Sequence, residues 1–271
     1  MKAKTVDVEQ LCSADFEVKL KSPRIASWDI ETAANQGDYW RSPWNTNIIE
    51  TTADTHMISW SVKTLGGRQI TRCLADYEGY EPGTRDDKAL VTELWELLDT
   101  FDILVAHHGD VFDLPYTKGR AAINGLRPSK KFKTVDTKKV AKRNFGFTSN
   151  KLNDIARLLG LGTKIPIHYE VWKQCRNGDP KAWALMKKYN AWDVKLLEQV
   201  YLKFRSWDEH HPNLNVLAGQ VAIACPSCGS TDYRSRGKDY TKTGYRDAYE
   251  CLNQECGRRY SGPHKRVTDY R

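Results

Sequence analysis

The sequence predicts an α/β domain, in which a mixed sheet is flanked by helices, followed by a small cysteine-containing module. Three observations lead to this prediction. Strand-like segments alternate with helical apolar periodicity through about the first 210 residues. Four cysteines then occur as two close pairs near the C-terminus. Finally, 271 residues with 40% hydrophobic content suffice for one large domain and one small one.

The first expected strand is Ile25–Thr32, which carries Asp29 and Glu31. Residues two apart on a strand point to the same face, so these carboxylates should be neighbours. Two anions on an apolar strand repel each other and resist burial, and a divalent cation between them removes both costs. Taken alone, the pair is better explained as two solvated acids on an edge strand, and the later carboxylates are what change this interpretation.

Periodicity and turn residues predict the elements that follow. Residues 33–50 are expected to form an irregular loop, whose Trp40 and Trp44 could stack on bases. The remaining elements are a hairpin of strands 56–63 and 69–74, a helix over 87–100, strands over 101–106 and 131–137, and helices over 115–122, 151–159 and 180–207. Ser149 or Asn150 is the expected cap of helix 151–159, and Asp179 that of helix 180–207.

Two further acids occur in informative places. Asp113 follows strand 101–106, and ligands of open α/β sheets bind at the carboxyl ends of strands. Asp193 lies in the long helix four residues after Tyr189, so the two side chains share a face. Neither position is distinctive alone, but the order of the four acids along the chain is.

Together, the motifs resemble those of the DEDD superfamily of 3′–5′ exonucleases, in its tyrosine subgroup, which includes the proofreading domains of DNA polymerases. The matching segments are Trp28-Asp29-Ile30-Glu31-Thr32, His108-Gly109-Asp110-Val111-Phe112-Asp113 and Tyr189-x-x-x-Asp193. The resemblance covers about residues 20–208. With Ser149-Asn150-Lys151-Leu152 and the terminal cysteines, the chain is similar to small phage-type exonucleases. The resemblance implies a ribonuclease H-like fold.

The resemblance also implies phosphodiester hydrolysis with two Mg²⁺ or Mn²⁺ ions. Asp29 would bridge both ions, Glu31 and Asp193 would complete one site, and Asp113 the other. Tyr189 would orient the attacking water, because a phenol with a pKa near 10 is a poor base at neutral pH.

The terminal cysteines predict a second metal site of a different kind. Cys225, Cys228, Cys251 and Cys256 form two short-spaced pairs, the pattern of a four-thiolate structural zinc site in a zinc ribbon. The predicted organisation is therefore a nuclease domain over 1–210, a linker over 211–221 and a zinc ribbon over 222–271. The scattered Cys12, Cys73 and Cys175 are expected to be core thiols.

The net charge of +8 favours a polyanionic partner, nucleic acid first, although a soluble basic surface would have the same composition. Residues 127–151 contain nine basic residues and one acid, Asp136. The candidate nucleic-acid contacts are His108, Phe112, Lys130, Lys131, Lys133, Arg234 and Arg236.

Three further side chains are open to more than one interpretation. His108 stands where the family usually has Asn, and is expected to contact phosphate or sugar, with simple packing as the alternative. His107 is expected to be structural. Lys164 could hold a phosphate, but a solvated lysine is the preferred interpretation.

The predicted function is two-metal 3′–5′ exonucleolysis of single-stranded or 3′-frayed DNA. The alternatives are an RNA-trimming exonuclease of the same fold and a catalytically silent nucleic-acid-binding or replisome-docking protein. A proofreading role would require a separate DNA polymerase. Residues 1–7 lack the apolar region of a signal peptide and no run could span a bilayer, so a cytoplasmic location is expected, in the host if phage-encoded.

Overall fold

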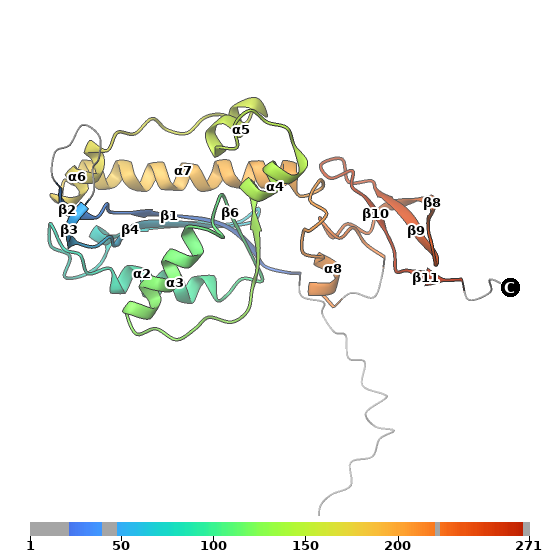
Figure 1. The fold of residues 1–271 in the computed structure, drawn as a ribbon, viewed down its shortest axis with the longest axis horizontal. Helices are drawn as coiled ribbons and strands as arrows, with labels where there is room; N and C mark the ends of the chain where they lie inside the picture. The colour runs from blue at the N-terminus through green and yellow to red at the C-terminus, as the bar shows by residue number, and fades with distance from the viewer. Residues whose placement is uncertain (1–21, 40–47, 220–222, 268–271) are drawn as a thin grey trace, which may run out of the picture.

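The structure is a computed structural model, and it describes residues 22–39, 48–219 and 223–267. Its centre is a five-stranded mixed sheet with the order β5-β4-β1-β6-β7 (Figure 1). The strands are β1 (Ile25–Thr32), β4 (Met57–Thr64), β5 (Gln69–Cys73), β6 (Ile103–Ala106) and β7 (Lys133–Asp136). β1 is antiparallel to β4 and parallel to β6. The predicted mixed α/β fold class is confirmed.

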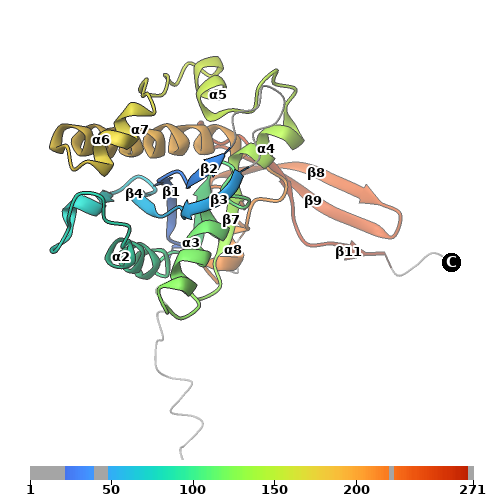
Figure 2. The same cartoon turned by 60° about the vertical axis from the view of Figure 1, so that its left-hand side comes forward.

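Helices cover both faces of this sheet (Figure 1, Figure 2). One face carries α2 (Lys88–Leu98) and α3 (Asp113–Ile123), and the other carries α4 (Thr137–Asn144), α5 (Leu152–Leu158) and α7 (Pro180–Phe204). The short α6 (Glu170–Arg176) packs against α7, and a 3-10 turn, η1 (Leu74–Asp76), follows β5. Of the helices in these ranges, none combines the length and apolar content that crossing a membrane requires.

The longest helix organises the core. Its start agrees with the prediction, because Pro180 is in the first turn and the Asp179 carboxylate accepts a hydrogen bond from the Lys181 N–H at 2.9 Å. Its first half packs through Met186 into a cluster around β1, β4 and α2. Its second half packs through Tyr201 into a cluster around β6, α4 and α5. The helix α7 therefore spans both apolar clusters, and this packing fixes the position of its polar residues over β1.

Two local predictions were wrong. Within the segment expected to be an irregular loop, β2 (Gln36–Tyr39) and β3 (Ile48–Ala53) form a separate two-stranded sheet, which the β-branched residues of β3 favour. Trp40 and Trp44 lie outside the described residues. The cap of α5 is Lys151 rather than Ser149 or Asn150. The Ser149 hydroxyl instead donates to the Asp154 carboxylate at 2.6 Å.

The C-terminal module is an antiparallel sheet of β8 (Tyr233–Thr241), β9 (Gly244–Cys251), β10 (Arg259–Ser261) and β11 (Lys265–Arg266). The interval predicted as a linker contains a short helix, α8 (Leu214–Leu217). Its Leu214 is buried in the core beside α7. At least this part of the interval therefore packs on the first domain.

A buried ion pair ties α2, α3 and β4 together. Asp87 is fully buried and accepts hydrogen bonds from two Arg120 nitrogens at 2.7 Å and from the Met57 N–H at 2.8 Å. Arg120→Met would leave this carboxylate buried without its cation. We expect the free energy of unfolding to fall by about 3–5 kcal/mol, measured by urea denaturation.

Arg72→Met is the matched control, because the Arg72–Glu93 pair is more than one third exposed on both sides. It should cost less than about 1 kcal/mol. Equal losses in the two variants would contradict a structural role for the buried pair.

Candidate metal-dependent active site

Three acids from two distant parts of the chain meet on the α7 side of β1. Asp29 and Glu31 come from β1, and Asp193 comes from the middle of α7. Each of the three offers a carboxylate oxygen, and these oxygens all lie within 4.8 Å of one another. Asp193 is almost fully buried, whereas the two β1 acids are half-buried. Three carboxylates at this separation form a site for a divalent cation that prefers oxygen ligands.

Asn190 holds the cluster together and was missed by the sequence analysis. It lies one helical turn before Asp193 and is fully buried. Its side-chain amide donates to Oδ2 of Asp29 at 2.8 Å, and its carbonyl accepts from the Ser59 hydroxyl at 3.2 Å. The sequence did contain a signal for this contact. Residues three apart on a helix share a face, so Asn190 was bound to lie beside Asp193.

Asp113 reaches the same strand through a backbone hydrogen bond. Its Oδ1 accepts a hydrogen bond from the backbone N–H of Ile30, the residue between Asp29 and Glu31, at 3.2 Å. Gly109 makes this possible, because a Cβ atom there would stand 2.2 Å from the Cβ of Ala106. The tight turn after β6 therefore needs glycine, and it starts α3 with Asp113 aimed at β1.

Burial raises the pKa of all four acids, and repulsion from other acids of the cluster adds to the increase for Asp29 and Glu31. Burial is the largest cause in every case. The pKa of Glu31 rises to about 8, with Asp193 as the next cause, and that of Asp113 rises to about 7. For Asp29, the other three acids all add to the increase. The cluster therefore resists full ionisation unless positive charge is present.

Lys164 supplies part of the positive charge that the acid cluster requires. Its interpretation as a solvated lysine was therefore wrong. Its ammonium lies 2.6 Å from Oδ2 of Asp193 and 3.3 Å from the Tyr189 hydroxyl. Two hydrogen bonds fix the segment: the Lys164 N–H donates to the Asn153 side chain at 2.8 Å, and the Trp192 indole donates to the Thr163 carbonyl at 2.7 Å. These contacts join residues far apart in sequence, so no local pattern indicated them.

Tyr189 lies beside Asp193 as the helical spacing predicts. Burial, then the charge of Asp193, raises the pKa of its phenol well above the ordinary value, so the hydroxyl stays protonated. Its ring packs edge-on against Trp172, with the ring centroids 6.2 Å apart. The hydroxyl is therefore held at the edge of the acid cluster as a hydrogen-bond donor.

The candidate nucleic-acid contacts fall into two groups. Phe112 and His108 are near the acids: Phe112 directly precedes Asp113, is 44% exposed and stacks on Tyr116. The His108 backbone has the left-handed φ of 72° and donates its N–H to Asp136 at 2.9 Å. His107 bonds the Thr137 hydroxyl and the Asn150 carbonyl, as a structural residue would.

The other candidates lie farther away. Lys133 begins β7 and pairs with Ile103 on β6. The end of β7 nearest the acids is Asp136, three residues and therefore about 10 Å away from Lys133. With Lys130 and Lys131 it lines a 620 Å³ cavity on the far part of the sheet. In the module, Arg234 and Arg236 both pair with Glu250. The structure does not bring these five residues to the acid cluster.

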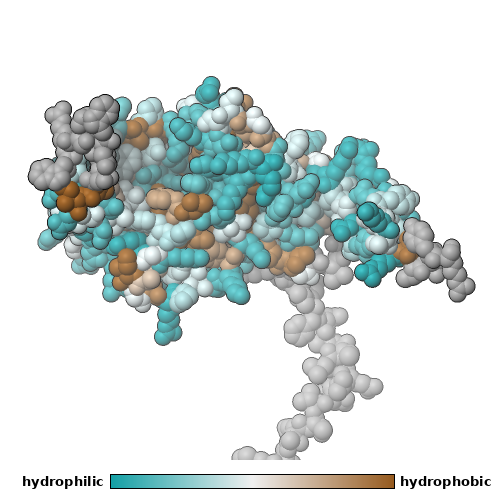
Figure 3. All heavy atoms as spheres, in the orientation of Figure 1, coloured by the Kyte–Doolittle hydropathy of each residue, from teal (hydrophilic) through white to brown (hydrophobic). Residues whose placement is uncertain are grey.

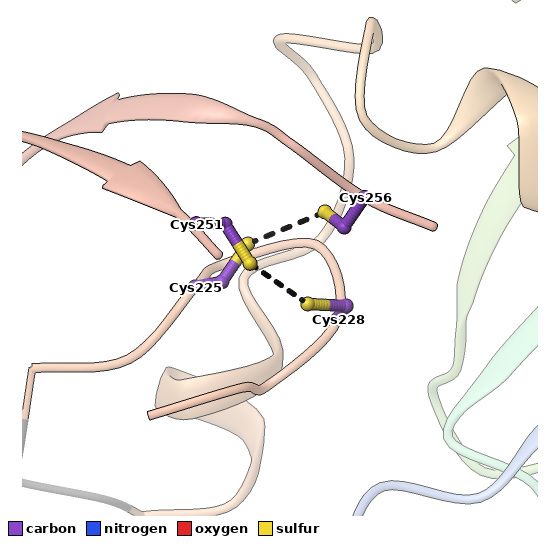
Figure 4. Close-up of side chains that lie close together, drawn as sticks. All are labelled: Cys225, Cys228, Cys251 and Cys256. Atoms are coloured by element: carbon purple, nitrogen blue, oxygen red, sulfur yellow. Dashed lines mark hydrogen bonds between the residues drawn. The ribbon is translucent and has the colours of Figure 1, made fainter. Parts of the chain in front are cut away.

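The four C-terminal cysteines converge on one point (Figure 4). The sulfurs of Cys225 and Cys256 are 3.7 Å apart, and those of Cys228 and Cys251 are 3.6 Å apart. A tetrahedral zinc ion with Zn–S bonds of about 2.3 Å separates its sulfurs by about 3.8 Å, so the donor set fits zinc. Of the other thiols, Cys73 and Cys175 are buried, and Cys12 lies outside the described residues.

A mixed sheet with an acid cluster beside its central strand is typical of metal-dependent hydrolases of phosphodiesters. Comparison with family models matches residues 49–205, more than half of the chain, to the RNase H superfamily. The chain therefore belongs to the RNase H superfamily. The matched range begins after β1, so it contains Asp113 and Asp193 but not the two β1 acids.

Among solved structures, the chain is similar to a family B DNA polymerase from the hyperthermophilic archaeon Pyrobaculum calidifontis, with 17% identity and a TM-score of 0.48. The match covers 82% of this chain and 32% of the polymerase, so the chain spans about a third of that protein. No curated protein matches the sequence.

The acid cluster predicts how stability depends on pH without metal. Because the folded-state pKa of Glu31 is raised from 4.5 to about 8, protonation stabilises the fold below this range. In EDTA, Tm should therefore fall as the pH rises from about 4.5 to about 8. Adding Mg²⁺ at the upper pH should restore much of the loss, measured by thermal denaturation.

Asp29→Asn removes one of the repelling charges. Its Tm in EDTA should exceed that of the native protein at the upper pH, and Mg²⁺ should no longer raise it. Glu96→Gln, which removes an exposed acid on α2, is the control and should behave like the native protein. An unchanged response to Mg²⁺ in Asp29→Asn would contradict a cation site at the cluster.

The cysteine cluster predicts about one zinc ion per chain, because a module of this size folds around its metal. Cys225→Ser should lose the zinc, measured by elemental mass spectrometry, and expose the module to proteolysis. Cys175→Ala, a buried thiol outside the cluster, should keep it. Full zinc content in Cys225→Ser would rule out this ligand set.

Proposed function

We propose that the protein is a metal-dependent 3′–5′ exonuclease of the DEDD superfamily, in its tyrosine subgroup, of the phage type that carries a zinc ribbon. One observation carries the proposal: Asp29, Glu31 and Asp193 converge, Asp113 reaches the same strand, and Tyr189 borders the cluster. Membership of the RNase H superfamily supports nuclease chemistry in broad terms.

The acids divide into two sets of ligands around Asp29. Glu31 and Asp193 have carboxylate oxygens within 4.8 Å of an Asp29 oxygen and would complete one ion site, whereas Asp113, which accepts the N–H of Ile30, would complete the other. Two Mg²⁺ or Mn²⁺ ions held by these oxygens would supply positive charge for both the attacking water and the leaving 3′ oxygen. Asn190 keeps Asp29 oriented through its amide.

Tyr189 and Lys164 complete the machinery. A phenol with a raised pKa cannot act as a base at neutral pH, so Tyr189 orients the attacking water by hydrogen bonding. The Lys164 ammonium pairs with Asp193 in the metal-free chain and remains one third exposed. A substrate phosphate at the cluster would come within reach of this charge, which then stabilises the negative charge of the transition state.

The proposed substrate is single-stranded or 3′-frayed DNA, with a separate DNA polymerase as a partner if the protein proofreads. Phe112 is placed to stack on a base next to Asp113, and His108 to contact phosphate or sugar. Lys130, Lys131, Lys133, Arg234 and Arg236 would contact more distant parts of the strand.

The experiment is digestion of end-labelled single-stranded and duplex DNA and RNA with Mg²⁺ or Mn²⁺. We expect mononucleotides from the 3′ end of single-stranded DNA, and no products in EDTA or with Asp29→Ala. Lys164→Met should lower kcat by about 10²-fold or more, as expected for loss of one preorganised charge. Lys88→Met, an exposed lysine on α2, is the matched control.

Products from the 5′ end, or activity that survives Asp29→Ala, would overturn the proposal. Faster digestion of RNA would assign the protein to the RNA-trimming alternative. Binding without hydrolysis of any substrate would assign it to the silent nucleic-acid-binding class.

A further inference from the structure

Two hollows that share Arg259 as a lining residue, together called the groove, lie at the end of the first domain and on the C-terminal module. The first part of the groove, 420 Å³, lies between Trp207, just after α7, and the segment Cys256–Arg259. Its second part, 360 Å³, lies on the module's sheet and is lined by Arg236, Tyr249 and Tyr260. Arg259 lines both parts. The two hollows therefore share one guanidinium group as a common wall.

We propose that this groove binds unpaired nucleotides of a single strand whose 3′ end lies in the acid cluster. The inference rests on the proposed function for the position of the 3′ end. The groove itself is defined by its own aromatic and cationic side chains, which are independent of the acids.

The exposed aromatic side chain of the groove, Trp207, is suited to stacking. The Trp207 side chain is 63% exposed, yet its indole is held edge-on against Phe145, with the ring centroids 5.7 Å apart. In the second part, Tyr249 is buried and Tyr260 is half-buried, so their rings, 5.5 Å apart, form the wall of the groove and do not offer an exposed stacking face. Because every base has a π-face, exposed rings held in place by packing bind single strands with little sequence preference.

The cations are suited to phosphates. Arg259 is exposed, and no carboxylate pairs with it among the residues that the structure describes. Glu250 pairs with both Arg234 and Arg236, which leaves one positive charge uncompensated in that trio. Asp239 is the one acid lining the second part, and it accepts the Ser261 hydroxyl at 2.5 Å. The groove and its rim therefore keep a positive balance.

The groove is preformed rather than assembled by loose domains. Arg258 donates from one nitrogen to the Asp208 carbonyl at 2.7 Å and to the Ser227 hydroxyl at 2.5 Å. These contacts fix the module against the end of the first domain. The visible face of the module is mostly hydrophilic (Figure 3), which favours a polar strand over an apolar protein surface.

The helix α4 links the groove to the acid cluster. It begins at the cap Asp136, which also accepts the His108 N–H beside the acids. It ends at Arg143 and Asn144, and Arg143 pairs with Asp208, the neighbour of Trp207. The helix is about 12 Å long, and Lys142 is exposed along it. A strand leaving the acids therefore meets basic side chains until it reaches Trp207.

The test measures binding of single-stranded DNA by fluorescence anisotropy in the Asp29→Asn background, so that hydrolysis does not interfere. Oligonucleotides of about 4 and about 16 nucleotides bracket the usual single-strand site sizes. Trp207→Ala should raise Kd for the long oligonucleotide about tenfold and leave the short one unchanged. Arg259→Ala should do the same and lower the salt slope by about 0.7.

Tyr240→Ala and Arg266→Ala are matched controls, since both side chains are exposed on the same module and line neither part of the groove. Zinc content checks that each variant is folded. If Trp207→Ala and Arg259→Ala bind the long oligonucleotide like the controls, the groove proposal is overturned. If the native protein hydrolyses nothing but these two variants still lose binding, only the exonuclease proposal fails.

Discussion

Repulsion among four carboxylates beside one strand is the constraint on which the structure depends. Asp29, Glu31, Asp113 and Asp193 carry more negative charge than their surroundings compensate. Their partners are the Ile30 N–H, the Asn190 amide and the Lys164 ammonium. Two of these three are neutral dipoles, so the metal-free cluster remains electrostatically incomplete. Divalent cations at the cluster would remove the repulsion, so the proposed metal site and the electrostatic cost of the metal-free cluster have the same origin.

The fold holds this unfavourable arrangement in place by surrounding it with rigid elements. β1 is a central strand, buried between two helical layers and paired on both edges. Its parallel pairing with β6 reaches Ser27, and beyond that point the Asp113 carboxylate takes the N–H of Ile30. The Asp113 carboxylate thus replaces a neighbouring strand as the hydrogen-bond acceptor. Packing of α7 across both apolar clusters supplies the stability that the acids oppose.

Local sequence patterns were sufficient for the parts of the site that lie within one element. The alternation of β1 puts Asp29 and Glu31 on one face, and the helical spacing puts Tyr189 beside Asp193. The same applies to the cysteine pairs, whose spacing defines turns. Lys164 and Asn190 differ, because their contacts depend on how α7 and the segment before α6 pack against β1. A lone lysine in a polar segment has no local property that distinguishes ion pairing from solvation.

The position of the proposed groove determines what it would do for catalysis. Its rings and guanidinium groups lie beyond α4, so they cannot touch the reacting phosphate. They would bind the strand equally in the ground state and the transition state, which lowers KM without raising kcat. Lys164 differs from these groove residues, because its charge lies at the acid cluster. In the proposed reaction, that is where the negative charge of the transition state would develop. The two sets of cations in this chain are therefore separable by kinetics, one acting through substrate affinity and the other through the chemical step.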